Sequence, residues 1–250
     1  EPEPAEVAQR LTVLNRLAAG EPTIVVAAVK AALHLTMPVE ALRASRRVLE
    51  VGQAIKREDL IEALLNLGYE RVALVDEVGQ FSARGGVVDF SPPTEPHPVR
   101  LEFFGDEIES LRYFDPVTQR SLAPVGKVLV GPAGEILLTR EAVQRALPAI
   151  RSAYRRELDL LHERERHREA ERLKERMSQD LELLENLRPH PSLTHYLPYL
   201  YQNPACLCAY LPEQAVLVVD EPVRVKSHAE QFEQEVRRAY ESAVKLGSHL

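Results

Sequence analysis

The sequence predicts a mixed fold that is α/β at both ends and α+β in the middle. Two apolar runs, 23–28 (TIVVAA) and 215–219 (AVLVV), have the composition of strands buried on both faces of a parallel sheet. Between them, residues 78–120 hold strand-like runs separated by Gly85-Gly86 and Gly105-Asp106, which are hairpin signals. We therefore expect an α/β domain interrupted by a small module built on an antiparallel sheet.

The composition allows a substantial core and restricts the class of partner. The chain has 250 residues, of which 45% are hydrophobic, and its formal net charge is -7. A negative protein lacks the broad basic surface that nucleic-acid binding requires. Trp is absent and aromatic residues make up 6%, so few side chains could stack on single-stranded bases. No run approaches the roughly 18 apolar residues of a membrane span, and no secretory signal is visible.

The two cysteines, Cys206 and Cys208, are expected to be reduced core residues on one face of a strand over 206–210. Cysteines this close in sequence seldom form a disulfide, and two thiols supply at most half of a zinc site. We therefore predict no metal site and a cytoplasmic protein, since reduced thiols persist in that compartment.

Periodicity and capping signals predict the remaining elements. We expect helices over 5–19, 29–35, 57–67, 139–187, 193–201 and 227–246, and strands over 46–51, 71–75, 99–104 and 107–114, besides a strand ending near Phe90. The long helix should break or kink at Pro148, and its charged part, 162–176, should face solvent. Ser227, with Glu230 three residues later, predicts a capping box for the last helix.

These elements predict three segments. They are an α/β flank over residues 1–45, an inserted α+β module over residues 46–130, and a second flank over residues 131–250 that contains the long charged helix.

One candidate for chemistry lies at 216–222, which read VLVVDEP. An apolar strand that ends in Asp220-Glu221 is typical of a Walker B segment, where the Asp orients Mg²⁺ and the neighbouring acid positions water. Such a site also needs a phosphate loop of the form G-x-x-x-x-G-K-[ST], which these 250 residues do not contain. An ordinary strand end is the competing interpretation.

Two further groups are weaker candidates. His162 and His167 are five residues apart, so on one helix they would point about 140° apart, unlike the H-E-x-x-H pair of a zinc site, and we interpret them as solvated. A duplex-binding site could use the basic cluster Arg43, Arg46 and Arg47, against which the net charge weighs.

The central sheet carries a candidate docking surface. Arg84 precedes the Gly85-Gly86 turn, so its side chain should stand at a hairpin tip. Arg100 and Phe104 share one face of their strand, while Leu101 and Phe103 should point into the core. An exposed aromatic flanked by arginines is typical of a protein-binding hot spot. A lone exposed Phe among structural ion pairs is the competing interpretation.

The stretch from Gly68 to Ser121 resembles a known family. It contains, in order, GYERV from Gly68, GQFSARGGVVD from Gly79, PVRLEFFGDEIESLRYFD from Pro98 and TQRS from Thr118. These segments resemble the second domain of the excision-repair protein UvrB and, more closely, the UvrB-like module of bacterial transcription–repair coupling factors (Mfd). The flanks resemble a degenerate helicase-like (P-loop NTPase-like) α/β domain 1, with residues 1–45 as the end of its first part and residues 131–250 as its returning part. In the returning part, Pro222 and Val223 stand where UvrB has Ser-His.

The resemblance implies a non-catalytic module that recruits UvrA in transcription-coupled nucleotide excision repair. It places the UvrA-contacting residues at Arg84, Arg100 and Phe104, and a degenerate Walker B at Asp220 and Glu221. It implies no cofactor in this segment, whereas ATP and Mg²⁺ would serve the DNA-translocating motor of the full-length parent. RNA polymerase and DNA would be bound by other parts, and a C-terminal domain of the parent would mask the UvrA-binding face. The alternative is a fragment of a UvrB-type ATP-dependent DNA helicase with Asp220 and Glu221 as Walker B acids.

Overall fold

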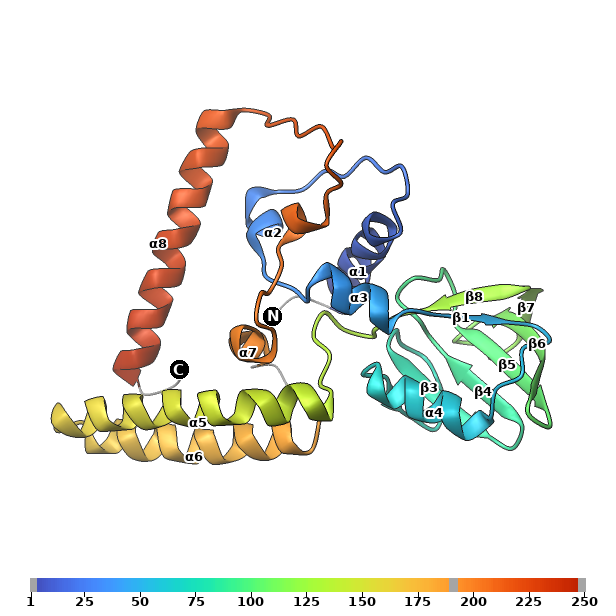
Figure 1. The fold of residues 1–250 in the computed structure, drawn as a ribbon, viewed down its shortest axis with the longest axis horizontal. Helices are drawn as coiled ribbons and strands as arrows, with labels where there is room; N and C mark the ends of the chain where they lie inside the picture. Colours follow the sequence, from blue (N-terminus) through green and yellow to red (C-terminus); the bar gives the residue numbers. More distant parts are fainter. Residues whose placement is uncertain (1–3, 189–192, 247–250) are drawn as a thin grey trace. The chain divides into compact units, whose positions relative to one another are not determined.

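The computed structural model describes residues 4–188 and 193–246 and shows two compact units (Figure 1). The first unit joins residues 1–24 to 37–137, and the second joins 25–36 to 138–250. These divisions differ from the domain ends predicted at 45 and 130. The predicted ends concern an inserted domain rather than compact units, and they stay a prediction.

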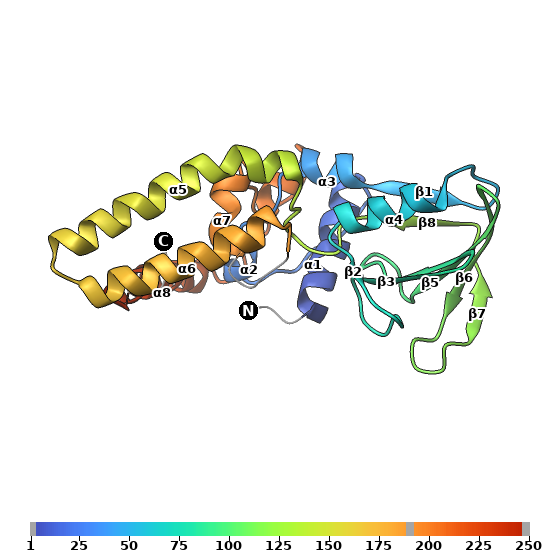
Figure 2. The ribbon, with the colours of Figure 1, turned by 90° about the horizontal axis from the view of Figure 1, so that it is seen from below.

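A six-stranded sheet dominates the first unit (Figure 1, Figure 2). In spatial order its strands are β2 (Glu70–Arg71), β3 (Gln80–Arg84), β4 (Val87–Phe90), β5 (Val99–Phe104), β6 (Glu107–Phe114) and β7 (Ser121–Pro124). β2 and β3 are parallel, and every other neighbouring pair is antiparallel. The predicted antiparallel sheet and its two hairpin turns are therefore confirmed, although the strand expected over 71–75 is limited to β2.

The rest of the first unit consists of a short second sheet and three helices. β1 (Arg47–Glu50) and β8 (Lys127–Val130) pair antiparallel, and the helices are α1 (Pro4–Ala18), α3 (Val39–Ser45) and α4 (Arg57–Asn66). The helices over 5–19 and 57–67 were predicted, whereas α3 was not. α1 is fixed within this unit by a hydrogen bond from Thr12 Oγ1 to the Pro93 carbonyl (2.9 Å) and an ion pair between Arg10 and Glu135 (2.6 Å).

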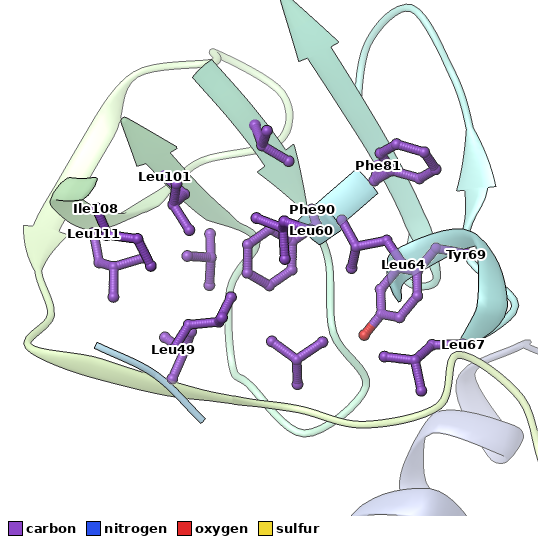
Figure 3. Close-up of a cluster of buried hydrophobic side chains, with 14 residues drawn as sticks. Leu49, Leu60, Leu64, Leu67, Tyr69, Phe81, Phe90, Leu101, Ile108 and Leu111 are labelled. Carbon is purple, nitrogen blue, oxygen red and sulfur yellow. The ribbon is translucent and has the colours of Figure 1, made fainter. Parts of the chain in front are cut away.

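The core of the first unit lies between α4 and one face of the sheet. Leu60 and Leu64 from α4 point toward Phe81, Phe90 and Leu101 from the strands (Figure 3). Alternate strand residues point to the same side, so each strand supplies one apolar row to this core. Leu101 is fully buried and Phe103 packs against the same cluster, as the alternation predicted.

A β-bulge in β6 keeps an apolar residue of that strand facing the core up to the end of the β5–β6 pair. Glu102 pairs with Ser110, but the next residue, Phe103, pairs with Ile108, so Glu109 is left unpaired in a β-bulge. Without the extra residue, Phe104 rather than Phe103 would lie opposite the fully buried Ile108. The bulge thus places Ile108, rather than Glu109, opposite the inward-facing Phe103.

Helices make up most of the second unit. They are α2 (Val29–Leu33), α5 (Arg140–Glu163), α6 (His167–Glu185), α7 (Leu193–Leu200), the 3₁₀ helix η1 (Leu207–Tyr210) and α8 (Pro222–Leu246). α5 and α6 run antiparallel side by side (Figure 1, Figure 2). The buried hydroxyl of Tyr154 on α5 bonds to Asp180 on α6 (3.1 Å) and to the hydroxyl of Tyr196 on α7 (2.6 Å), which ties the three helices together.

Two helix boundaries differ from the predictions. α5 continues through Pro148, and the chain turns instead at 164–166, where Glu165 adopts a left-handed conformation (φ 57°). The helix is therefore not broken at Pro148, whereas a kink there stays a prediction, and the expected continuous helix over 162–176 was wrong. α8 begins at Pro222 and not at Ser227, because proline suits the first turn of a helix, where its missing N–H is not needed.

The strands predicted over 23–28, 206–210 and 215–219 are absent from the described structure. Residues 207–210 form η1, while the two apolar runs have no regular structure and expose Ile24, Val26, Val216 and Val218. A strand needs a neighbour for its backbone N–H and C=O groups, and no described residue pairs with these runs. Cys206 is half-buried and Cys208 exposed, so the expectation of two core cysteines was also wrong.

We expect the core to depend on buried positions of α4 and not on exposed ones. Leu64→Ala should lower the free energy of unfolding by about 3 kcal/mol, because it leaves a cavity against the sheet. Leu65→Ala, one residue later and half exposed, should change it by less than about 0.5 kcal/mol. Urea unfolding followed by circular dichroism measures both, and equal losses would contradict this account of the core.

Candidate functional site

The candidate site is the face of the six-stranded sheet opposite the core, which we call the outer face. Residues directly opposite each other on paired strands share a face, as do alternate residues along one strand. The register therefore places on the outer face Ser82, Arg84, Val87, Asp89, Arg100, Glu102, Phe104, Glu107, Ser110, Arg112 and Phe114.

The Gly85-Gly86 turn brings Arg84 and Phe104 to the same end of the outer face. The Gly86 carbonyl accepts a hydrogen bond from the Phe103 backbone N–H (2.8 Å), so the β3–β4 turn lies beside the end of β5. A Cβ at Gly86 would lie 3.3 Å from the Phe103 oxygen, which explains why glycine suits this position. Phe104 is 78% exposed and the Arg84 side chain 58% exposed. A cation and an apolar ring are thus accessible at one edge of the face.

Arg100 is held within the outer face by Asp89. Asp89 lies on β4 directly opposite Arg100 on β5, and its carboxylate accepts bonds from Arg100 Nε (2.8 Å) and Nη2 (2.9 Å). The Asp89 side chain is only 2% exposed and that of Arg100 19% exposed. These bonds hold the pKa of Arg100 above its ordinary value. Arg84 reaches the same carboxylate at a longer 3.4 Å, so Asp89 lies between both arginines.

Two further groups complete the surroundings of Arg100. Its Nη1 donates to the Gln119 carbonyl (3.2 Å), and its guanidinium lies over the ring of Phe114, 4.7 Å from the centroid. Phe114 belongs to the outer face but is fully buried there. We call Asp89, Phe114 and the Gln119 carbonyl the Arg100 socket.

The loop over 115–120 carries the Gln119 carbonyl and is ordered by Asp115. One oxygen of Asp115 accepts bonds from the backbone N–H groups of Val117 (3.0 Å) and Thr118 (2.6 Å) and from the Thr118 hydroxyl (3.0 Å). Gln119 is left-handed (φ 60°), and its side-chain amide donates to the Val75 carbonyl (3.0 Å). The residues Thr118 to Ser121, which carry part of the family resemblance, therefore help to build the socket.

A second charged pair lies beside the first. Glu102 accepts bonds from the Ser110 hydroxyl (2.7 Å) and from Arg112 (3.4 Å), whose side chain is 44% exposed. The outer face thus carries three arginines, Arg84, Arg100 and Arg112, and three acids, Asp89, Glu102 and Glu107, so its charges balance. Its cations are arranged so that an acidic group of a partner could reach Arg84 and Arg112, whose side chains are exposed.

The structure brings the three predicted residues onto one face but does not make them equivalent. Arg84 and Phe104 are exposed as predicted, whereas Arg100 is mostly enclosed. Sequence reasoning missed the roles of Asp89, Arg112 and Phe114. The signal available for Asp89 was its place as the single charged residue in the apolar strand Val87–Phe90.

The other candidates are not assembled into a site. Asp220 and Glu221 lie in an exposed turn before α8, where Glu221 pairs with Arg224 (2.5 Å), and their role as a degenerate Walker B stays a prediction. His162 and His167 flank the α5–α6 turn with ring centroids 6.1 Å apart. Among the described residues, no cluster of three or more His, Cys, Asp or Glu is placed to hold a metal ion. Arg43, from the basic cluster considered for duplex binding, donates a hydrogen bond to the Ala18 carbonyl (2.9 Å) within the first unit.

Every helix in the described part of the chain is too short or too polar to cross a membrane.

Comparison with known proteins identifies the segment that carries the outer face. Residues 48–135 match the UvrB interaction domain family. The transcription-repair-coupling factor of Bacillus subtilis (strain 168) is 37% identical over 228 residues, which cover 91% of this chain and 19% of that protein. The corresponding factor of Myxococcus xanthus is 33% identical over 97% of this chain and 20% of its own length. The UvrABC system protein B of Gloeothece citriformis (strain PCC 7424) is 36% identical over 79% of this chain and 30% of its own length. The chain therefore spans about a fifth to a third of the length of these relatives.

We expect the loop over 115–120 to loosen in acid. Hydrogen bonds, chiefly from the Thr118 backbone, lower the pKa of Asp115, so the charged form stabilises the fold at neutral pH and this contribution is lost as the pH falls below about 4. Asp115→Asn should lower the melting temperature at pH 7, and its difference from the wild type should shrink toward pH 3. Asp106→Asn, in the exposed β5–β6 turn, removes the same charge and is the control. Thermal unfolding at several pH values measures this, and a constant difference for Asp115→Asn would contradict it.

Proposed function

Because residues 48–135 belong to the UvrB interaction domain family, we propose that this chain is the UvrA-recruiting module of a transcription–repair coupling factor. It acts in transcription-coupled nucleotide excision repair by docking UvrA on the outer face, without catalysis of its own. The observation that carries this proposal is the 78% exposure of Phe104 beside Arg84 on the sheet of that domain. In the longer parent protein, other parts of the chain would bind RNA polymerase and DNA, while this module would bind UvrA.

The geometry supports a specific division of contacts. Phe104 offers a whole ring to an apolar recess on UvrA, and buried aromatic groups are frequent hot spots of interfaces. Arg84 is bound to Asp89 only at 3.4 Å, which leaves most of its donors for an acidic group of the partner. Arg112 adds a second exposed cation to the same face, because Arg100 is mostly enclosed. The site thus favours a partner that combines an apolar recess with carboxylates.

A UvrB-type helicase is the second candidate function, supported by the 36% identity to a UvrABC system protein B. In that case Asp220 and Glu221 would be Walker B acids. Their exposed turn and the Glu221–Arg224 ion pair weaken this candidate. It requires a phosphate loop before Glu1 in a longer parent, so the sequence that precedes these residues distinguishes the two functions.

We further propose that the second unit belongs to a degenerate helicase-like α/β domain whose sheet is incomplete in these residues. The runs 23–28 and 215–219 have the apolar composition of central strands and yet expose most of their large side chains. Exposed apolar runs of this kind are unfavourable in water unless another segment covers them. The relatives are three to five times as long as the matched regions, so a longer parent could supply the missing strands. In this view the domain is a scaffold, and it holds no bound nucleotide.

We expect loss of the Phe104 ring to weaken UvrA binding most. Phe104→Ala should raise the Kd for UvrA about thirtyfold, or about 2 kcal/mol, because a central aromatic contact is removed. Isothermal titration of purified UvrA against the folded variant measures the change.

Two exposed positions outside the outer face are the controls for that titration. Leu65→Ala alters an exposed apolar side chain on α4, which covers the core side of the sheet, and Arg47→Ala removes an exposed cation on β1. Both should bind like the wild type. The docking site is wrong if Phe104→Ala binds normally while it remains folded.

We expect the two apolar runs to be unprotected until the longer parent covers them. Amides of 23–28 and 215–219 should exchange with solvent within seconds in the 250-residue chain, because they make no strand pairing among the described residues. They should be protected in a longer parent protein, while β4 is protected in both. Hydrogen-exchange mass spectrometry tests this, and unchanged fast exchange in the parent would argue against a completed sheet.

A further inference from the structure

The most unusual group of the outer face is the buried carboxylate of Asp89, which is not itself one of the exposed contact residues. Asp89 is 2% exposed and lies on β4, between Ser82 of β3 and Arg100 of β5. A buried carboxylate is stable only with bonded partners, and here both oxygens are occupied by arginine N–H groups. The arginine rather than the acid reaches the surface, so Asp89 itself is not a contact group.

The bonds to Asp89 determine which part of Arg100 a partner can meet. The Nε and Nη2 edge, which would form the bidentate pair with a carboxylate, is turned to Asp89. Nη1 is directed to the Gln119 carbonyl, and the guanidinium lies over the ring of Phe114. Three groups from three different parts of the chain therefore fix one side chain in a single orientation.

We propose that Asp89 is a positioning residue for docking, which fixes Arg100 in its socket so that the charged surface is set before UvrA arrives. The inference rests on the proposed function. A long arginine side chain loses considerable freedom when it is ordered at an interface, and an arginine that is already ordered avoids that loss on binding. Asp89 thus acts on the partner only through Arg100.

A double-mutant cycle between Asp89 and Arg100 tests this mechanism. Asp89→Asn keeps the shape of the side chain but removes its charge and one acceptor oxygen. It should raise the Kd for purified UvrA about tenfold when Arg100 is present, and less than about twofold in the Arg100→Ala background. Asp89→Asn should also make the Arg100 Nε proton exchange faster in nuclear magnetic resonance spectra. In the Arg100→Ala background, Asp89→Asn should raise the melting temperature, because it removes a buried acid left with one distant partner.

The possible outcomes separate this inference from the proposed function. An equal loss in both backgrounds means that Asp89 only maintains the sheet, and tighter binding means that it competes with UvrA for Arg100. Either result overturns the positioning role, as does normal binding of Asp89→Asn when Arg100→Ala binds weakly. Normal binding of Arg84→Ala, Arg100→Ala and Phe104→Ala together would instead overturn the docking function, and the positioning role with it.

A second variant keeps the inference testable if Asp89→Asn does not fold. Phe114→Leu removes the ring beneath the guanidinium while leaving every charge and most of the buried volume in place. It should weaken UvrA binding in the presence of Arg100 and have no further effect in the Arg100→Ala background. Binding of Phe114→Leu that is unchanged in both backgrounds would contradict a socket that acts through Arg100.

Discussion

The pair formed by Asp89 and Arg100 joins β4 to β5 on the face of the sheet that does not hold the core. Removal of one partner from a buried pair typically costs about 3–5 kcal/mol, since the other charge is left without compensation. The same arginine also joins β5 to the loop after β6 through the Gln119 carbonyl, and it covers Phe114. The outer face is therefore organised around one cation whose donors are largely used inside the protein.

This arrangement depends on strict two-sidedness of the sheet. Phe90 and Leu101 face α4, while their neighbours in sequence, Asp89 and Arg100, face the other way. A shift of one strand by one residue in the β4–β5 register would turn that strand over, which would move its charge, Asp89 or Arg100, into the apolar core and separate the pair. The bulge at Glu109 keeps the apolar Ile108 of β6 on the core side, opposite Phe103, while the regular alternation of β5 sends Phe104 to the surface.

The parts of the fold that could be predicted are those set by local sequence. The glycine turns, the apolar alternation and the cap signals fixed the hairpins, α4 and the inward direction of Leu101. The features that could not be predicted depend on contacts between segments that are distant in the chain. The run 215–219 has a strand composition but needs a hydrogen-bonding neighbour, and none is supplied by the described residues. Arg100 looked exposed because its partner, Asp89, lies on another strand, 11 residues away. Alternation in sequence shows which face a residue occupies, but not what covers it there.

The separation between enclosed and exposed charges bears on how the outer face could discriminate among partners. Arg100 and Glu102 have their closest contacts inside the protein, so a partner meets them in orientations that the sheet has already set. Arg84 and Phe104 are the groups whose environment would change most on contact, because one is loosely paired and the other faces water. A partner with an acid but no apolar recess would leave Phe104 solvated, and one with a recess but no acid would desolvate Arg84 without compensation. Recognition by this face would therefore require both features at a fixed separation, which is set by the hydrogen bond between Gly86 and Phe103.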